Sequence, residues 1–248
     1  MITRRSTLAG LLAAPMFARP ALADAPLKVV ATTGMIADAA RAIGGPLVEV
    51  TQLMGSGVDP HAYRQTRSDV AALARADLVL WNGLYLEAQL ERLLSDLSRR
   101  VPVVPVAEAT PPDALLRHAD YEDRADPHVW MAPRLWRHAV EATRDALLEQ
   151  RAEDRFSGNA ARYLDSMAEY DTRARSALES IPEAARVLVT AHDAFGYFGR
   201  DYGFDVLGIQ GLSTQSEAGL ARIAELVGTL VRRKIGAVFV ESSVSDRN

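Results

Sequence analysis

Short strand-like runs alternate with helical ones along the chain. Continuous apolar and β-branched runs predict four strands in the first half, at residues 27–32, 48–53, 78–81 and 101–106. Apolar positions at helical spacing predict helices between and after them, at residues 35–43, 68–75, 85–97 and 135–150. Strands that alternate with helices predict an α/β lobe with a largely parallel sheet over residues 26–154, with residues 110–125 as a polar loop.

A long helix follows, and after it a second set of strands and helices. Residues 155–182 carry apolar side chains at helical spacing and end at Ile181-Pro182. At ~1.5 Å per residue such a helix reaches beyond a small lobe, so we expect it to link two lobes. Residues 183–248 then hold only three short strands, and no helix covers the last strand, predicted at residues 237–240. We therefore expect a C-terminal α/β lobe that is truncated.

The first 23 residues have the pattern of an export signal. Arg4 and Arg5 precede a short apolar run, and a small-x-small cleavage site ends at Ala23. The run is too short to span a bilayer and contains proline. We expect residues 1–23 to be a signal peptide and the mature protein to lie in a periplasm, exported by either the Sec or the twin-arginine route.

Composition narrows the chemistry. The 248 residues are 48% hydrophobic and 24% charged with a net charge of −4, which is typical of a globular protein and gives no reason to expect nucleic acid as a partner. The chain has no cysteine, so we expect no disulfide and no thiolate metal site, and we also expect that the protein is not a lipoprotein. Any metal must be held by nitrogen and oxygen ligands.

Three of the five histidines recur at similar intervals, each beside an aspartate. These pairs are Asp59 with His61, Asp126 with His128, and His192 with Asp193. Imidazole nitrogen is a standard zinc ligand, and a nearby carboxylate can orient the ring through its other nitrogen. We therefore interpret the histidines as metal ligands and the aspartates as the groups that orient them. His118, in an acidic loop, and His138, on a helix, are interpreted as surface residues.

Motifs across nearly the whole chain resemble those of one family. They include Gly57-Val58-Asp59-Pro60-His61-Ala62-Tyr63, Asn82-Gly83-Leu84-Tyr85-Leu86-Glu87, Asp126-Pro127-His128-Val129-Trp130, Thr190-Ala191-His192-Asp193 and Phe239-Val240-Glu241. The chain is identified by these motifs as similar to the metal-specific solute-binding proteins of bacterial zinc and manganese ABC importers, known as cluster A-I or family 9. The resemblance implies two α/β lobes joined by one long helix, with the metal in the cleft between them.

The resemblance also implies the ligands and the partners. His61, His128 and His192 match three family ligands, and the fourth, a carboxylate, is expected beyond Asn248. The implied cargo is Zn²⁺ or Mn²⁺, delivered to an inner-membrane permease with its cytoplasmic ATPase, and we expect a monomer. Three imidazoles favour zinc. The lack of a long histidine-rich loop resembles the branch that also carries manganese, so the transported metal stays open.

Two other classes of function are open. Three histidines with a free fourth position also suit an exported zinc hydrolase, with Asp193 or Glu241 as general base. Some members of the family have been called adhesins, which makes cell adhesion a further alternative. The sequence offers no convincing pair of nucleophile and base, so we expect a binding protein and not an enzyme.

Overall fold

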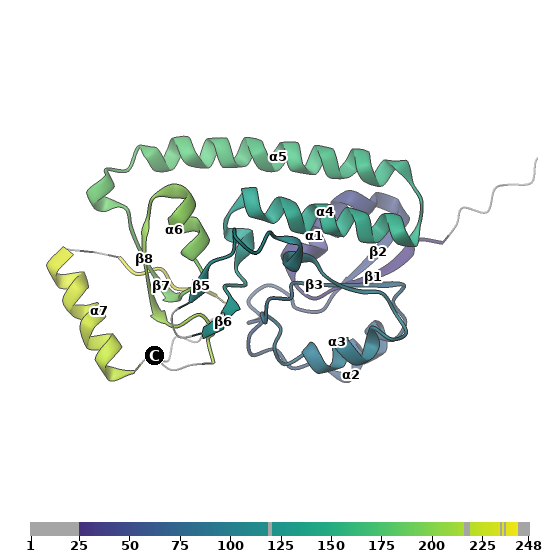
Figure 1. Cartoon of the computed structure of the whole chain (residues 1–248), viewed down its shortest axis with the longest axis horizontal. Coiled ribbons are helices and arrows are strands. Elements are labelled where there is room, and N and C mark those ends of the chain that lie inside the picture. Colours follow the sequence, from purple (N-terminus) through teal and green to yellow (C-terminus); the bar gives the residue numbers. More distant parts are fainter. Residues whose placement is uncertain (1–24, 119–120, 216–218, 234, 236, 243–248) are drawn as a thin grey trace, which may run out of the picture.

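The computed structural model describes residues 25–118, 121–215, 219–233, 235 and 237–242. Two α/β lobes lie side by side, and one long helix runs across both (Figure 1). The predicted signal peptide, residues 1–23, lies outside the described residues. None of the described helices combines the length and the hydrophobicity needed to cross a bilayer.

The N-terminal lobe is built on a four-stranded parallel sheet with the strand order β2-β1-β3-β4. Its strands are β1 (Leu27–Ala31), β2 (Val48–Gln52), β3 (Leu78–Trp81) and β4 (Val103–Pro105). The strands β1 and β3 are the central pair, and both of their faces are buried, which explains their continuous apolar sequence. The strand β4 lies at an edge of the sheet, a position that suits Pro102 just before it and Pro105 at its end.

Helices cover both faces of this sheet. Alternate residues of β1, such as Val29 and Val30, belong to two separate cores. One core is shared with α1 (Gly34–Gly44) and α4 (Pro133–Gln150), and the other with α2 (Arg67–Leu73) and α3 (Glu91–Leu97). The helix α3 begins later than the predicted residues 85–97. Leu84 and Tyr85 have positive φ angles, which an α-helix cannot continue through.

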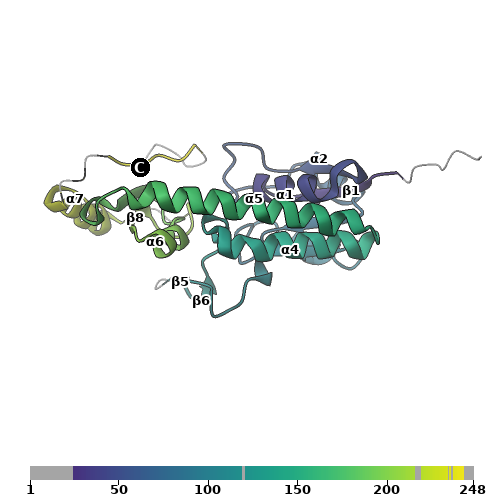
Figure 2. The ribbon, with the colours of Figure 1, turned by 90° about the horizontal axis from the view of Figure 1, so that it is seen from above.

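The linking helix is α5 (Asp154–Glu179), with 26 residues. Its first turns pack against α1 and α4, where Phe156 and Ala160 are buried. Its other end reaches the second lobe and contacts α6 (Gly196–Tyr202). Seen from above, α5 lies along the length of both lobes (Figure 2).

The C-terminal lobe contains two paired parallel strands, β7 (Val187–His192) and β8 (Asp205–Gln210). The helix α6 joins them and ends at Gly203 in the left-handed conformation, and α7 (Leu220–Arg233) follows β8. In place of the strand predicted at residues 237–240, a single parallel bridge joins Phe239 to Thr190.

The remaining elements are short. The prediction of a plain loop at residues 110–125 was wrong, because β5 (Arg117–His118) and β6 (Tyr121–Ala125) pair there as an antiparallel hairpin. The described part of the chain also contains four 3₁₀ turns: η1 (Gly45–Leu47), η2 (Val106–Ala109), η3 (Val129–Met131) and η4 (Glu183–Ala185).

Phe156 anchors the linking helix to the N-terminal lobe, and its side chain is fully buried. We expect Phe156→Ala to lower the free energy of unfolding by about 3–5 kcal/mol, since it leaves a cavity between α5 and its neighbours. Tyr170→Ala is the matched control on the same helix, because Tyr170 is 64% exposed. This substitution should change the free energy of unfolding by about 0.5 kcal/mol or less. Urea titrations of the metal-free variants measure both, and equal losses would contradict this role of Phe156.

Candidate metal centre

The structure brings all three predicted histidines together. His61 lies in the loop between β2 and α2, His128 immediately before η3, and His192 at the carboxyl end of β7. One possible ligand atom from each lies within 4.8 Å of the others, and the Nε2 atoms of His61 and His128 are 3.2 Å apart. All three side chains are buried and line a cavity of about 380 Å³. The site thus draws on both lobes, at the carboxyl ends of their strands, where α/β folds commonly bind ligands.

Burial sets the protonation state of His61. Removal from water, with His128 and His192 as neighbours, lowers the pKa of His61 from 6.5 to about 3. The ring is therefore neutral at neutral pH, with a free nitrogen lone pair. This is the form in which imidazole binds a metal, so the site is prepared for a cation before one arrives.

Asp126 holds the His128 ring. Its Oδ1 atom accepts hydrogen bonds from His128 Nδ1 at 2.7 Å and from the His128 backbone N–H at 2.9 Å. Since Nδ1 is engaged by the carboxylate, Nε2 is left to face the other two histidines. These hydrogen bonds support the interpretation of Asp126 as the group that orients His128, which stays a prediction.

Glu241 takes the corresponding position at His192. Its Oε1 atom lies 2.8 Å from His192 Nδ1. The sequence interpretation had assigned this place to Asp193 and had considered Glu241 only as a general base. The signal that could have found Glu241 is strand register, because Phe239 pairs with Thr190, and both Glu241 and His192 lie two residues further on.

Asp59 supports the His61 loop and does not contact the ring. Its Oδ1 accepts the backbone N–H of His61 at 2.9 Å, and its Oδ2 accepts the hydroxyl of Thr214 at 2.5 Å. The side-chain amide of Gln215 donates to the backbone oxygen of His61. Two residues of the second lobe therefore hold the loop that carries His61.

A buried polar network lies behind the site. Glu87 is fully buried, and its Oε1 accepts hydrogen bonds from Thr32 Oγ1 at 2.7 Å and Asn82 N at 2.8 Å. Asn82 in turn donates through Nδ2 to the backbone oxygen of Pro127 at 3.1 Å, beside His128. Burial raises the pKa of Glu87 to about 7 against these hydrogen bonds, which favour its charged form. The network ties the ends of β1 and β3 to the loop before His128.

Of the other two histidines, His138 is separate from this site. His138 lies on α4, with Nδ1 3.8 Å from a carboxylate oxygen of Glu141. His118 lies on β5, and its side chain is outside the described part of the structure. Among the described residues, only His61, His128 and His192 form a group that could hold a metal ion.

Two α/β lobes with a cluster of three imidazoles between them define a metal-binding solute-binding protein. A family model described as the periplasmic zinc-uptake complex component A (ZnuA) matches residues 29–248. The chain belongs to this family, and the protein is therefore the metal-binding component of an ABC transporter, working with a permease and an ATPase, and not an enzyme.

Curated relatives and solved structures agree with this assignment. The chain is 46% identical over 253 residues to the manganese-binding lipoprotein MntA of Bacillus subtilis (strain 168), covering 96% of this chain and 82% of the relative. It is 42% identical over 232 residues to the zinc-binding protein TroA of Treponema pallidum (strain Nichols), covering 93% and 75%. The structure of the periplasmic TroA superposes with a TM-score of 0.87 at 41% identity, covering 90% of this chain and 80% of that one.

The expectation that the protein is not a lipoprotein was wrong. MntA, its relative at 46% identity, is named a lipoprotein, and so are other relatives. The expectation rested only on the lack of cysteine in the printed sequence.

The contact between Glu241 and His192 gives a prediction for the site. We expect Glu241→Ala to weaken zinc binding about 10- to 100-fold, because the ring of His192 loses the partner that orients it. Glu241→Gln should recover part of this loss, since an amide oxygen still accepts from Nδ1. Glu183→Gln, at an exposed carboxylate of the same lobe, is the control. Zinc affinity measured against a chelator tests all three, and wild-type affinity in Glu241→Ala would contradict the assignment.

The lowered pKa of His61 gives a pH dependence. Below its unfolded pKa of 6.5 the unfolded chain binds a proton that the folded protein does not, so stability present above pH 6.5 is lost as the pH falls toward 3. Between pH 7 and 5 this amounts to about 2 kcal/mol. We expect the metal-free wild type to lose that much more stability over this range than His61→Gln, in urea unfolding at each pH. If the free energies of unfolding of the two proteins changed in parallel with pH, the lowered pKa of His61 would be refuted.

Proposed function

We propose that the protein captures one divalent metal ion with His61 Nε2, His128 Nε2 and a nitrogen of His192. The observation that carries this proposal is the convergence of three buried imidazoles on one point, with carboxylates on the Nδ1 atoms of His128 and His192. Three imidazole nitrogens this close together can donate their lone pairs to one metal ion. Three protein nitrogens leave one coordination position, for which a carboxylate ligand remains a prediction.

We further propose how the chain divides around this site. Residues 26–154 and 183–248 form the two lobes, and residues 155–182 form the linking helix. His61 and His128 come from the first lobe and His192 from the second, so a bound ion would join the lobes. The protein would act as a monomer and without nucleic acid, since one chain supplies all three imidazoles and the net charge of −4 does not favour a polyanion.

Zinc is the metal that we propose binds more tightly in vitro. An all-nitrogen set of three imidazoles suits zinc, and the intrinsic affinity of nitrogen and oxygen sites is lower for manganese than for zinc. The relatives do not decide the transported metal, because MntA is named for manganese and TroA for zinc. What the cell loads into this protein depends also on the metal available.

The test is a competition titration of the protein with zinc and manganese, with bound metal quantified. We expect one ion per chain, with zinc displacing manganese. His61→Ala, His128→Ala and His192→Ala should each weaken zinc binding about 100-fold or more, since each removes one of three protein ligands.

His138→Ala is the matched control, because it removes an imidazole that lies on α4 outside the cluster. Wild-type zinc affinity in one of the three variants would remove that histidine from the site. Manganese retained against an excess of zinc would mean that the geometry of the cleft outweighs ligand preference.

A further inference from the structure

The three imidazoles are not equivalent. His128 and His192 each have a carboxylate oxygen within 2.8 Å of Nδ1. For His61, the hydrogen bonds among the described residues involve its backbone and Nε2, and none reaches Nδ1. Since Nε2 of His61 faces His128, Nδ1 lies on the side of the ring away from the cluster. When Nε2 holds a metal ion, Nδ1 carries a proton and becomes a hydrogen-bond donor.

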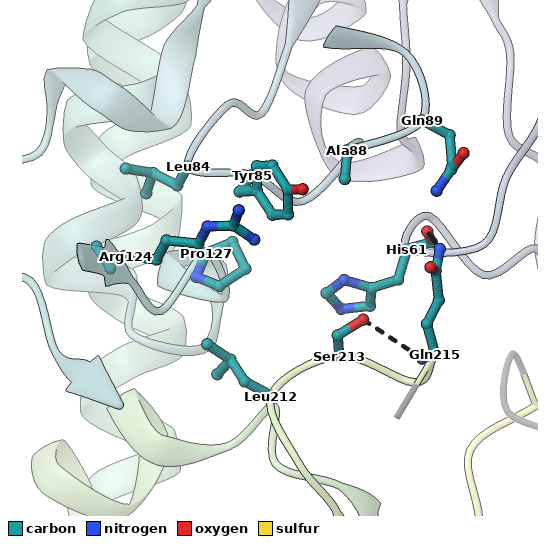
Figure 3. Close-up of a pocket in the computed structure, with 11 residues that line it drawn as sticks. His61, Leu84, Tyr85, Ala88, Gln89, Arg124, Pro127, Leu212, Ser213 and Gln215 are labelled. Atoms are coloured by element: carbon teal, nitrogen blue, oxygen red, sulfur yellow. Dashed lines mark hydrogen bonds between the residues drawn. The ribbon is translucent and has the colours of Figure 1, made fainter. Parts of the chain in front are cut away.

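A second cavity adjoins this histidine. It has a volume of about 290 Å³ and lies between the two lobes, on the side of His61 where the second lobe contributes Leu212 and Gln215. The imidazole of His61 points into it, and Arg124 and Tyr85 lie on the opposite wall (Figure 3). The cavity is large enough for a small organic molecule.

The wall of this cavity offers hydrogen-bond donors and a positive charge. Among the described residues that line it, none is an aspartate or a glutamate. The Arg124 guanidinium lies over the Tyr85 ring, 3.4 Å from its centre, and among the described residues no carboxylate lies within ion-pair distance of it. Glu91 acts on Arg124 only at longer range. A guanidinium held on a ring in this way presents its N–H fork to an oxyanion.

The backbone beneath Tyr85 is strained. Leu84 and Tyr85, with φ angles of 52° and 68°, are the two described residues other than glycine in the left-handed region. This conformation costs roughly 1–2 kcal/mol per residue. A hydrogen bond from Leu84 N to Glu108 Oε1 at 3.2 Å helps to hold it. Backbone strain of this kind persists where the surrounding structure holds a side chain in a fixed position. Here it holds the Tyr85 ring under the guanidinium of Arg124.

We propose that this cavity binds a small carboxylate anion. One oxygen accepts the Nδ1 proton of His61, and the carboxylate also accepts from the guanidinium of Arg124. The anion thus occupies the position at Nδ1 of His61 that the carboxylate of Asp126 occupies at His128 and that of Glu241 at His192. This inference rests on the proposed function, because the Nδ1 donor is fixed when Nε2 binds the metal.

Metal and anion then strengthen each other's binding. A carboxylate on Nδ1 makes an imidazole a stronger metal ligand, and the metal makes Nδ1 a better donor to the anion. The coupling is reciprocal, so the factor by which the anion raises zinc affinity equals the factor by which zinc raises anion affinity.

Acetate is the probe, and acetamide, of the same shape but uncharged, is its control. We expect saturation-transfer NMR on the full chain to show acetate binding that is tighter in the zinc-loaded than in the metal-free protein, and no comparable binding of acetamide. Arg124→Gln should weaken acetate binding about tenfold or more, as expected for a lost charge-assisted hydrogen bond. Arg99→Gln, which removes an exposed guanidinium of the same lobe, should bind acetate like the wild type.

Equal binding of acetate and acetamide would overturn the proposal, and so would wild-type acetate affinity in Arg124→Gln. Zinc affinity measured in buffer without carboxylates tests the metal site alone. If zinc binds there and acetate does not bind in either state, the anion site is wrong and the metal site stands. If zinc does not bind, the proposed function fails whatever acetate does.

Discussion

The structure depends on holding three imidazoles close together inside the protein, where burial keeps the His61 ring uncharged at neutral pH. Two Nε2 atoms only 3.2 Å apart cannot both carry protons without strong repulsion, and burial makes a charged ring costly even singly. A cluster of this kind adds little to the stability of the folded protein until a cation binds to it. Its presence in the cleft therefore means that the fold is organised for binding, with both lobes contributing to a site that neither completes alone.

Orientation of the rings comes from three different sources. Asp126 reaches His128 from two residues away, which is a local contact within one turn of chain. Glu241 reaches His192 across 49 residues, through the parallel bridge between Phe239 and Thr190. His61 is held at its backbone, by Asp59 and by the Gln215 amide, and its ring is held by neither. The freedom left at Nδ1 of His61 follows from this difference.

The sequence predicted most of the N-terminal lobe, since its apolar periodicity is regular. Repeated motifs also predicted that three histidines would lie together, while their role as metal ligands stays a prediction. The sequence could not distinguish Asp59 from Asp126. Both precede a histidine by two residues and accept its backbone N–H at 2.9 Å, and only the rotation of the ring decides whether the carboxylate also meets Nδ1. Ring rotation is set by tertiary packing. The contact between Glu241 and His192 was not predicted for a related reason. It depends on the register between two segments that are distant in the sequence, and the local pattern of apolar and polar residues does not show that register.

The contacts between the lobes show which part of the site is most firmly built. The hydroxyl of Tyr197, a fully buried residue of α6, donates to the backbone oxygen of Asp126 at 2.7 Å and accepts from Leu116 N at 3.1 Å. On the same helix, the buried carboxylate of Asp201 receives two hydrogen bonds from Arg134 of α4.

Because α6 begins four residues after His192, these contacts fix the His192 strand end against the loop of His128. The loop of His61 meets the second lobe through Thr214 and Gln215, which are half-buried and exposed. The pair formed by His128 and His192 is therefore held by more deeply buried contacts. An ion that binds this pair meets His61 as the ligand whose position the protein constrains least.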